Sequence, residues 1–323
     1  MEKSKKRDRI IILIALLVVA LAVVAGVILW IIRHTYADKP LQNIYFTEYE
    51  KEKDKNDTII YKYDQENDEL VEIGSVPGNL YHCTINKEET LITGFLKEES
   101  AEGIPTLIQY DIETGTVQTT DVMEKLQELP EDVRLWSATL YDGGNKIFIN
   151  YTDENENKCT LTYDIVTGER EAILVNLEKV RVYLAINEQG LWYWRDDAIY
   201  KYEWETQTET KISDAPPDRG RLAPSTGLIA YVTDRQKKIY VYNISSGKSQ
   251  CIVPHMWNTY YTSFGSAMWT NDGRQLCYYK DFPGFSPLYS DTSLMVYDVK
   301  SGKSHCIYKV KNTMHTFQYI KSN

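Results

Sequence analysis

The residues that could carry out catalysis form no recognisable motif in this 323-residue chain. A serine nucleophile of the hydrolase type stands in a Gly-x-Ser-x-Gly turn between a strand and a helix. The nearest approach to that motif, GFSPL at residues 284–288, lacks the last glycine. None of the histidines forms the His-x-x-x-His pair of a zinc site; they are His34, His82, His255, His305 and His315. The sequence therefore offers no catalytic or metal-binding set, and we expect no cofactor.

Two aromatic segments near the C-terminal end are better suited to binding. They are VPHMWNTYY at residues 253–261 and DFPGFSPLY at residues 281–289. Rigid rings with polar tips suit protein or sugar surfaces. The alternative is that these rings pack on one another and hold two long loops in place. The candidate binding residues are His255, Trp257, Tyr260, Tyr261, Phe282, Phe285 and Tyr289.

A recurring hairpin indicates the elements that position these segments. In each copy an apolar, alternating stretch runs into Tyr-Asp or a close variant, a polar turn follows, and a second strand leaves. In the regular copies a glycine supplies the positive φ of the turn. Those copies carry Gly115, Gly168, Gly247 and Gly302, and the two degenerate copies place Asn67 and Gln207 there. Because glutamine adopts a positive φ poorly, we expect a different turn type at Gln207.

The spacing of the copies predicts the fold class. Their tyrosines recur every 39 to 55 residues, and a four-stranded propeller blade needs about 40–50 residues. A second polar turn between apolar segments lies within each interval. The sequence therefore predicts an all-β, six-bladed propeller.

One copy resembles a known repeat. The segment WTNDGRQLCYY at residues 269–279 is similar to the TolB-type propeller repeat, whose first turn carries a Ser-Pro-Asp-Gly-like signature. The other copies keep the WD-like strand pattern but not the full signature. The resemblance covers six repeats from about residue 42 to the end, and it implies a six-bladed ring. It does not assign a function, because the family spans scaffolds, peptidase modules and lipoproteins.

The two ends of the propeller are expected to join. The first unit has only three strands, at residues 43–49, 58–64 and 69–74, whereas one strand, 315–320, is left over at the C-terminus. An unpaired edge is a liability in a sheet protein, so we expect residues 315–320 to become the innermost strand of the first blade. One segment, 121–134, departs from the β pattern and has the spacing of a two-turn helix.

The N-terminus predicts a membrane anchor. Residues 10–32 contain no charge and no proline, and a helix of that length, about 34 Å, crosses a hydrocarbon core of about 30 Å. Basic residues before this span place the N-terminus in the cytoplasm. We expect a cytoplasmic tail at 1–9, a signal-anchor helix at 10–32 in the bilayer, a linker at 33–41 and an extracytoplasmic propeller at 42–323. The alternative is a cleaved signal peptide.

The net charge and the cysteine content limit the kinds of partner and the compartment that are expected for this chain. The net charge of −10 becomes about −13 without the cationic tail, which argues against nucleic acid as a partner. The five cysteines are odd in number and have no zinc-site spacing. We expect free, mostly buried thiols, which suit a Gram-positive plasma membrane surface better than a disulfide-dependent compartment.

Two functions remain open. The first is a binding or scaffold module for a protein or for a cell-envelope glycan or peptide. The second is a hydrolase or lyase that cleaves cell-wall polysaccharide or peptide in the propeller funnel. The second needs acidic or histidine side chains together where the inner strands begin. The expected starts are Leu80, Trp136, Tyr183, Arg221 and Ser266, which favour the first function.

Overall fold

The protein is described from a computed structural model. The described residues are 41–52, 55–97, 106–120, 134–152, 158–173, 180–214, 220–233, 238–254, 260–261, 267–283, 290–311 and 316–322. Residues from Asn43 to the C-terminus form one compact unit. The predicted anchor at 10–32 lies outside the described residues, as does the predicted helix except for Arg134, which begins a strand. Within the described ranges no helix is long and apolar enough to span a bilayer.

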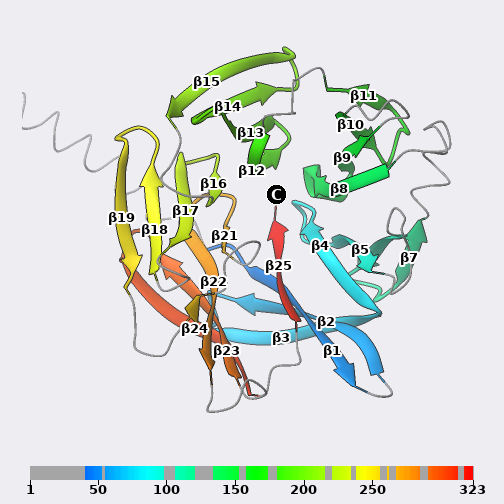
Figure 1. Ribbon diagram of the computed structural model, residues 1–323. Coiled ribbons are helices and arrows are strands. Elements are labelled where there is room, and N and C mark those ends of the chain that lie inside the picture. Colours follow the sequence, from blue (N-terminus) through cyan, green and yellow to red (C-terminus); the bar gives the residue numbers. More distant parts are fainter. Residues whose placement is uncertain are drawn as a thin grey trace, which may run out of the picture. The chain divides into compact units, whose positions relative to one another are not determined.

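Twenty-five strands form six antiparallel blades in the described part of the chain, arranged around a common centre (Figure 1). We letter the strands of each blade A to D from the centre outward. Blade 1 contains β25 (Thr316–Ser322), β1 (Ile44–Glu52), β2 (Lys55–Asp64) and β3 (Glu69–Pro77). Blade 2 contains β4 (Asn79–Ile85), β5 (Leu91–Lys97), β6 (Thr106–Asp111) and β7 (Val117–Thr120). Blade 3 contains β8 (Arg134–Tyr141), β9 (Lys146–Thr152), β10 (Lys158–Asp164) and β11 (Arg170–Ala172), with the 3-10 turn η1 (Asp142–Gly144) after β8.

The remaining blades follow the same order. Blade 4 contains β12 (Val180–Asn187), β13 (Gly190–Arg195), β14 (Ala198–Glu203) and β15 (Thr208–Asp214). Blade 5 contains β16 (Gly220–Ala223), β17 (Leu228–Thr233), β18 (Lys238–Asn243) and β19 (Lys248–Val253). In blade 6 two short inner strands, β20 (Tyr260–Tyr261) and β21 (Met268–Trp269), precede β22 (Gln275–Pro283), β23 (Ser290–Asp298) and β24 (Lys303–Lys311). The predicted six-bladed, all-β propeller is confirmed.

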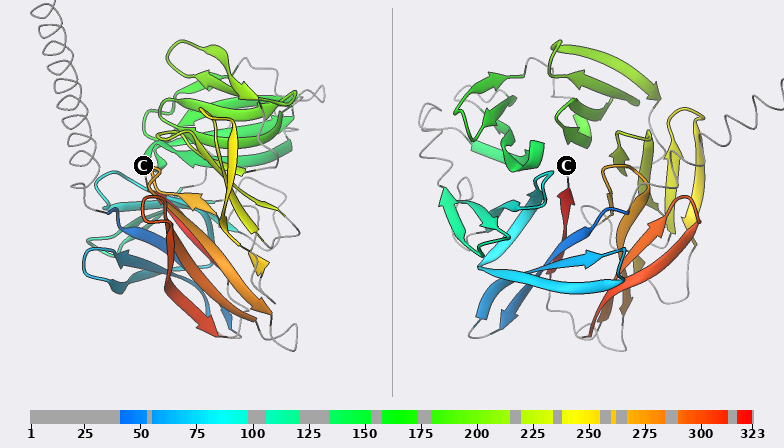
Figure 2. Two further views of the ribbon diagram at one scale, coloured as in Figure 1. Left: turned by 90° about the vertical axis from the view of Figure 1, so that its left-hand side faces the viewer. Right: turned by 180° about the vertical axis from the view of Figure 1, so that it is seen from behind.

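The C-terminal strand closes the ring, as predicted from the strand count. β25 pairs antiparallel with β1, with Phe46 opposite Tyr319, and parallel with β4, with Ile85 opposite Ser322. Blades 1 and 2 thereby share one continuous eight-stranded sheet, and Figure 2 shows β25 between them from behind. The side chain of Ile320 on β25 is fully buried. The observed strand begins at Thr316, one residue later than predicted, and extends to Ser322.

Alternation along each strand fills the spaces between blades. On β17 the side chain of Ile229 packs with Leu184 of blade 4, and the next side chain, Ala230, packs with Trp269 of blade 6. Successive side chains of a strand point to opposite faces of the sheet, so each blade contributes one face to each neighbour. The same arrangement produces a buried apolar cluster at each of the six blade interfaces in the described residues.

The turns between strands C and D share one conformation, which corrects two expectations. The residue four positions after the Tyr-Asp aspartate, or its equivalent, has a positive φ, as at Gly247 (+64°). In blade 1 this residue is Asp68 (+53°), not the predicted Asn67, and in blade 4 Gln207 adopts +52°. The expectation of a different turn at Gln207 was therefore wrong. The two flanking strands are paired up to Glu203 and Thr208, and this pairing imposes the left-handed conformation on glutamine despite its cost.

The five cysteines have free thiols, as expected, but they are not mostly buried. Cys83 and Cys277 are fully buried, and burial raises the pKa of both thiols. Cys159 is half-buried. Cys251 and Cys306 are exposed because they lie on the outermost strands β19 and β24, whose outer sides carry no further blade layer.

Replacing Thr58 by valine is expected to destabilise the junction of blades 1 and 2. The buried Thr58 hydroxyl donates to the Gly78 carbonyl at 2.6 Å and accepts from the Leu80 amide at 2.9 Å. Valine keeps the shape but leaves both backbone groups without this partner, and each such buried group costs about 1–3 kcal/mol. We expect Thr58→Val to lower the free energy of unfolding by about 2–4 kcal/mol. Urea unfolding measures this loss, and a change below about 0.5 kcal/mol would contradict it.

Candidate functional site

The backbone brings the two predicted aromatic segments together. Tyr260 and Tyr261 pair with Asp281 and Lys280, and Phe282 follows directly on the same strand, β22. Strand pairing thus places these three residues near one another at one edge of blade 6. They lie on strands, not in loops as expected, because β22 continues as far as Pro283. The other candidates, His255, Trp257, Phe285 and Tyr289, lie outside the described residues.

A second set of residues, which the sequence analysis did not single out, lies on the inner strands. These strands contain no aspartate or glutamate, although the chain as a whole carries a net charge of −10. Their basic residues are His82, Arg134, Arg181, Arg221 and Lys321. In the described part of the chain, the inner strands thus carry basic residues and no acidic ones.

The three inner-strand arginines share one end of the ring. Arg134 is the first residue of β8, and Arg181 and Arg221 are the second residues of β12 and β16. Each A strand begins where the connection from the preceding D strand arrives. The D–A and B–C connections lie at the same end of a propeller, because successive strands of a blade are antiparallel. The aromatic segments of blade 6 occupy connections at this same end, which we call the D–A end.

In the described part of the chain, the recorded hydrogen bonds of Arg221 are with neutral groups. Its guanidinium Nη1 donates to the carbonyl oxygen of Tyr183 on the neighbouring β12, at 3.1 Å. Its own carbonyl accepts a hydrogen bond from Trp269 Nε1 at 2.9 Å, which fixes β16 against β21. The side chain is half-buried, and burial lowers the pKa of Arg221 from its ordinary value.

His82 lies on β4, on the opposite side of the ring from β16 (Figure 1). Its backbone has a φ of +51°, at an irregularity where the pairing of β4 with β5 shifts between Tyr81 and Thr84. The side chain is exposed to solvent, yet burial is the larger cause of its lowered pKa, followed by the positive charge of Arg221. β4 is an inner strand of the ring, and its pairing with β5 is interrupted at His82. An exposed side chain at an interrupted position of an inner strand opens toward the centre of the ring, and this is where we place His82.

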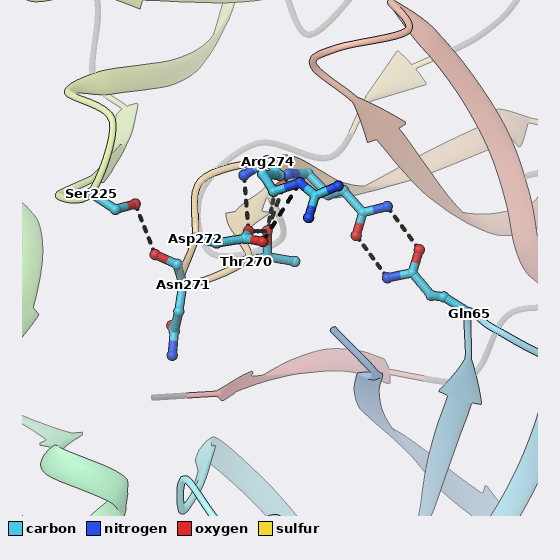
Figure 3. Close-up of polar contacts among 7 residues, drawn as sticks. Gln65, Ser225, Thr270, Asn271, Asp272 and Arg274 are labelled. Carbon is cyan, nitrogen blue, oxygen red and sulfur yellow. Dashed lines mark hydrogen bonds and ion pairs between the residues drawn. The ribbon is translucent and has the colours of Figure 1, made fainter. Parts of the chain in front are cut away.

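The opposite end of the ring is held by polar contacts between turns. In the A–B turn of blade 6, Thr270 Oγ1 and the Arg274 amide both donate to Asp272 Oδ1, at 2.7 and 3.0 Å (Figure 3). Ser225 of blade 5 donates to the Asn271 carbonyl at 2.8 Å. This turn contains the Asp-Gly pair that resembles the TolB-type signature, and its contacts are structural.

Two further contacts span blades at this end. Gln275 of blade 6 and Gln65 of blade 1 exchange two amide hydrogen bonds of 2.7 Å (Figure 3). Lys87 and Glu188 form an ion pair of 3.1 Å between the A–B turns of blades 2 and 4, which are not neighbours in the ring. This pair therefore crosses part of the A–B end. The D–A end, with its basic strand starts and aromatic segments, is the better candidate for ligand access.

Comparison with known proteins bears on the fold. The sequence matches no protein-family model and no curated protein. Among solved structures, it is similar to TolB from Acinetobacter baumannii, with 12% identity, a TM-score of 0.56 and coverage of 87% of this chain and 66% of that one. It is also similar to the putative TolB from Agrobacterium tumefaciens, with 12% identity, a TM-score of 0.53 and coverage of 87% and 99%. The chain thus spans slightly less than two thirds of the A. baumannii protein. At this identity the likeness shows the fold alone: the chain is a TolB-like six-bladed β-propeller.

Proposed function

We propose that this chain is a binding module of the cell envelope, held in the plasma membrane by residues 10–32 with the propeller outside the cytoplasm. Its ligand is a protein or a cell-envelope glycan or peptide, bound at the D–A end of the ring. The observation that carries this proposal is the convergence of two ligand-binding features at that end. The aromatic residues of blade 6 and the basic starts of β8, β12 and β16 come from separate parts of the sequence.

The architecture supports a binding role. A closed ring holds its loops on rigid strands, and a preorganised surface loses little conformational entropy when a ligand binds. TolB-like propellers suit binding and scaffold roles for this reason. The alternative, a funnel hydrolase or lyase, is supported by His82 alone, since cleavage of a glycoside needs two carboxyl groups and the inner strands carry none.

Loss of the aromatic rings should remove ligand capture. We expect the full-length Trp257→Ala/Phe285→Ala variant, solubilised in a neutral detergent, to recover at least about tenfold less cell-wall fragment or envelope protein than the wild type, because clustered aromatic anchors dominate binding energy. A pull-down quantified by mass spectrometry measures the recovery.

The matched control removes an apolar side chain from the other end of the ring. Val166 lies in the C–D turn of blade 3 and is 76% exposed. The Val166→Ser variant should recover the same partners as the wild type. Equal recovery by the aromatic double variant and by Val166→Ser would show that the rings only pack against one another.

A further inference from the structure

Arg221 differs from Arg195, an arginine on the second strand of blade 4. The guanidinium of Arg195 donates to both carboxylate oxygens of Glu209, at 2.8 and 2.5 Å, and lies 4.4 Å from the ring centroid of Tyr200. A half-buried cation is normally matched by an anion in this way. Arg221 has no ion pair in the described part of the chain, and only a neutral carbonyl accepts one of its five N–H groups.

The group that acts on Arg221 across the ring is a second base. This base is His82. Its backbone φ of +51° is uncommon for a residue other than glycine, so the backbone is strained at this position. An irregularity of strand pairing re-aims a side chain away from the regular alternation. Strain of this kind clusters at ligand sites, where the surrounding structure maintains it. Two bases thus lie on inner strands of opposite blades, and the inner strands of the described ring carry no carboxylate.

This arrangement has an electrostatic consequence. A space lined by one sign of charge and walled by protein concentrates the field and attracts counter-ions. A guanidinium presents a planar fork of donors that matches two oxygens of one anion. We infer that Arg221 and His82 bind an oxyanion, the carboxylate or phosphate group of a ligand, at the inner wall of the propeller. This inference deepens the proposed binding function and rests on it.

The first test compares two variants that remove the same charge. Arg221→Gln should weaken the Kd for inorganic phosphate, for acetate or for both by at least about tenfold, since it removes the fork of donors. Lys248→Gln, on the exposed start of the outer strand β19, should leave the Kd unchanged. Full-length protein in neutral detergent is titrated with each salt at constant ionic strength set by sodium chloride, and the rise in Tm reports binding.

Folding is checked in the same scans. Without added anion, Arg221→Gln should melt no lower than the wild type, because it removes a buried charge that no carboxylate balances. Binding of phosphate alone or of acetate alone supports the site and identifies the ligand group. No rise in Tm beyond the chloride control, or an equal rise in Arg221→Gln, overturns the site. Arg221→Lys provides a second check, and it should retain part of the affinity, since it keeps the charge without the fork.

The second test uses pH. Arg221 and Tyr81, whose ring centroid lies 5.1 Å from that of His82, are among the charged and titratable groups around His82. In the free protein the pKa of His82 is lowered below its ordinary value. A bound anion offsets the charge of Arg221 and raises this pKa, so binding takes up a proton and the affinity rises as the pH is lowered toward the pKa of His82. His82→Asn, which tolerates the same backbone conformation, should remove this dependence. An identical pH profile in both proteins contradicts the role of His82.

These tests separate the two proposals. If wild-type protein captures its partner through the aromatic residues but shows no oxyanion-specific stabilisation, the inner-wall site is wrong and the binding function stands. If phosphate or acetate binds through Arg221 while the aromatic double variant captures as much partner as the wild type, the inner-wall site stands and the aromatic contact is wrong.

Discussion

Truncation of the chain after Lys311, the last residue of β24, is expected to abolish the cooperative unfolding transition of the propeller. The deletion removes β25, which is hydrogen-bonded on both edges, to β1 over Tyr45–Tyr49 and to β4 at Thr84–Ile85. It also removes Ile320 from the core between blades 1 and 2. The A strand of blade 1 would be lost, and two paired strands would become open edges.

The effect should exceed that of any single core substitution. Ile320→Ala keeps the strand and removes only its buried side chain, which costs about 2–5 kcal/mol. The full-length variant should therefore still melt cooperatively but at a lower temperature, whereas the truncated chain should show no sharp transition in circular dichroism or calorimetry. A chain that lacks only Asn323 is the length control and should behave as the wild type. A truncated chain with the wild-type Tm would show that β25 does not close the ring.

Local patterns made the fold predictable because each blade is built from short-range contacts. The alternation of apolar residues and the turn residues of each hairpin lie within one repeat, so they are visible without any tertiary information. Closure by β25 was also predictable, since a strand count leaves one strand over and one place empty. What failed were conformations imposed by pairing, as at Gln207, where strands on both sides force a positive φ on an unfavourable residue.

The candidate site was less predictable, for a reason of geometry. The aromatic segments are short runs of unusual composition, and their adjacency follows from strand order within a single blade. His82 and Arg221 belong to blades 2 and 5, on opposite sides of the ring, and they line the same centre only when the ring is closed. The available signal was an arginine at the start of three consecutive A strands, together with the absence of acids from those strands. That signal can be interpreted only after the inner strands have been identified in the structure.

Gly190 is a position where the fold tolerates no side chain. It begins β13, where it pairs with Asn187 across the A–B turn and with Glu203 on β14. A Cβ atom added there would lie 2.1 Å from the carbonyl oxygen of Tyr202. This carbonyl belongs to the backbone of β14, which is paired with β13 residue by residue. It therefore cannot move aside as a flexible side chain would. A methyl group would have to separate the two central strands of blade 4.

We therefore expect Gly190→Ala to lower the free energy of unfolding by about 3 kcal/mol or more, at the upper end of what overpacking costs. Gly247→Ala is the matched control: its Cβ would meet nothing within 4 Å, and only the φ of +64° opposes it. That strain costs about 1–2 kcal/mol. Urea unfolding of both full-length variants gives the comparison, which isolates steric overlap with the backbone from conformational strain. If the two variants lose equal stability, β13 and β14 can separate at Gly190 without loss, and blade 4 is less tightly paired than its strand register indicates.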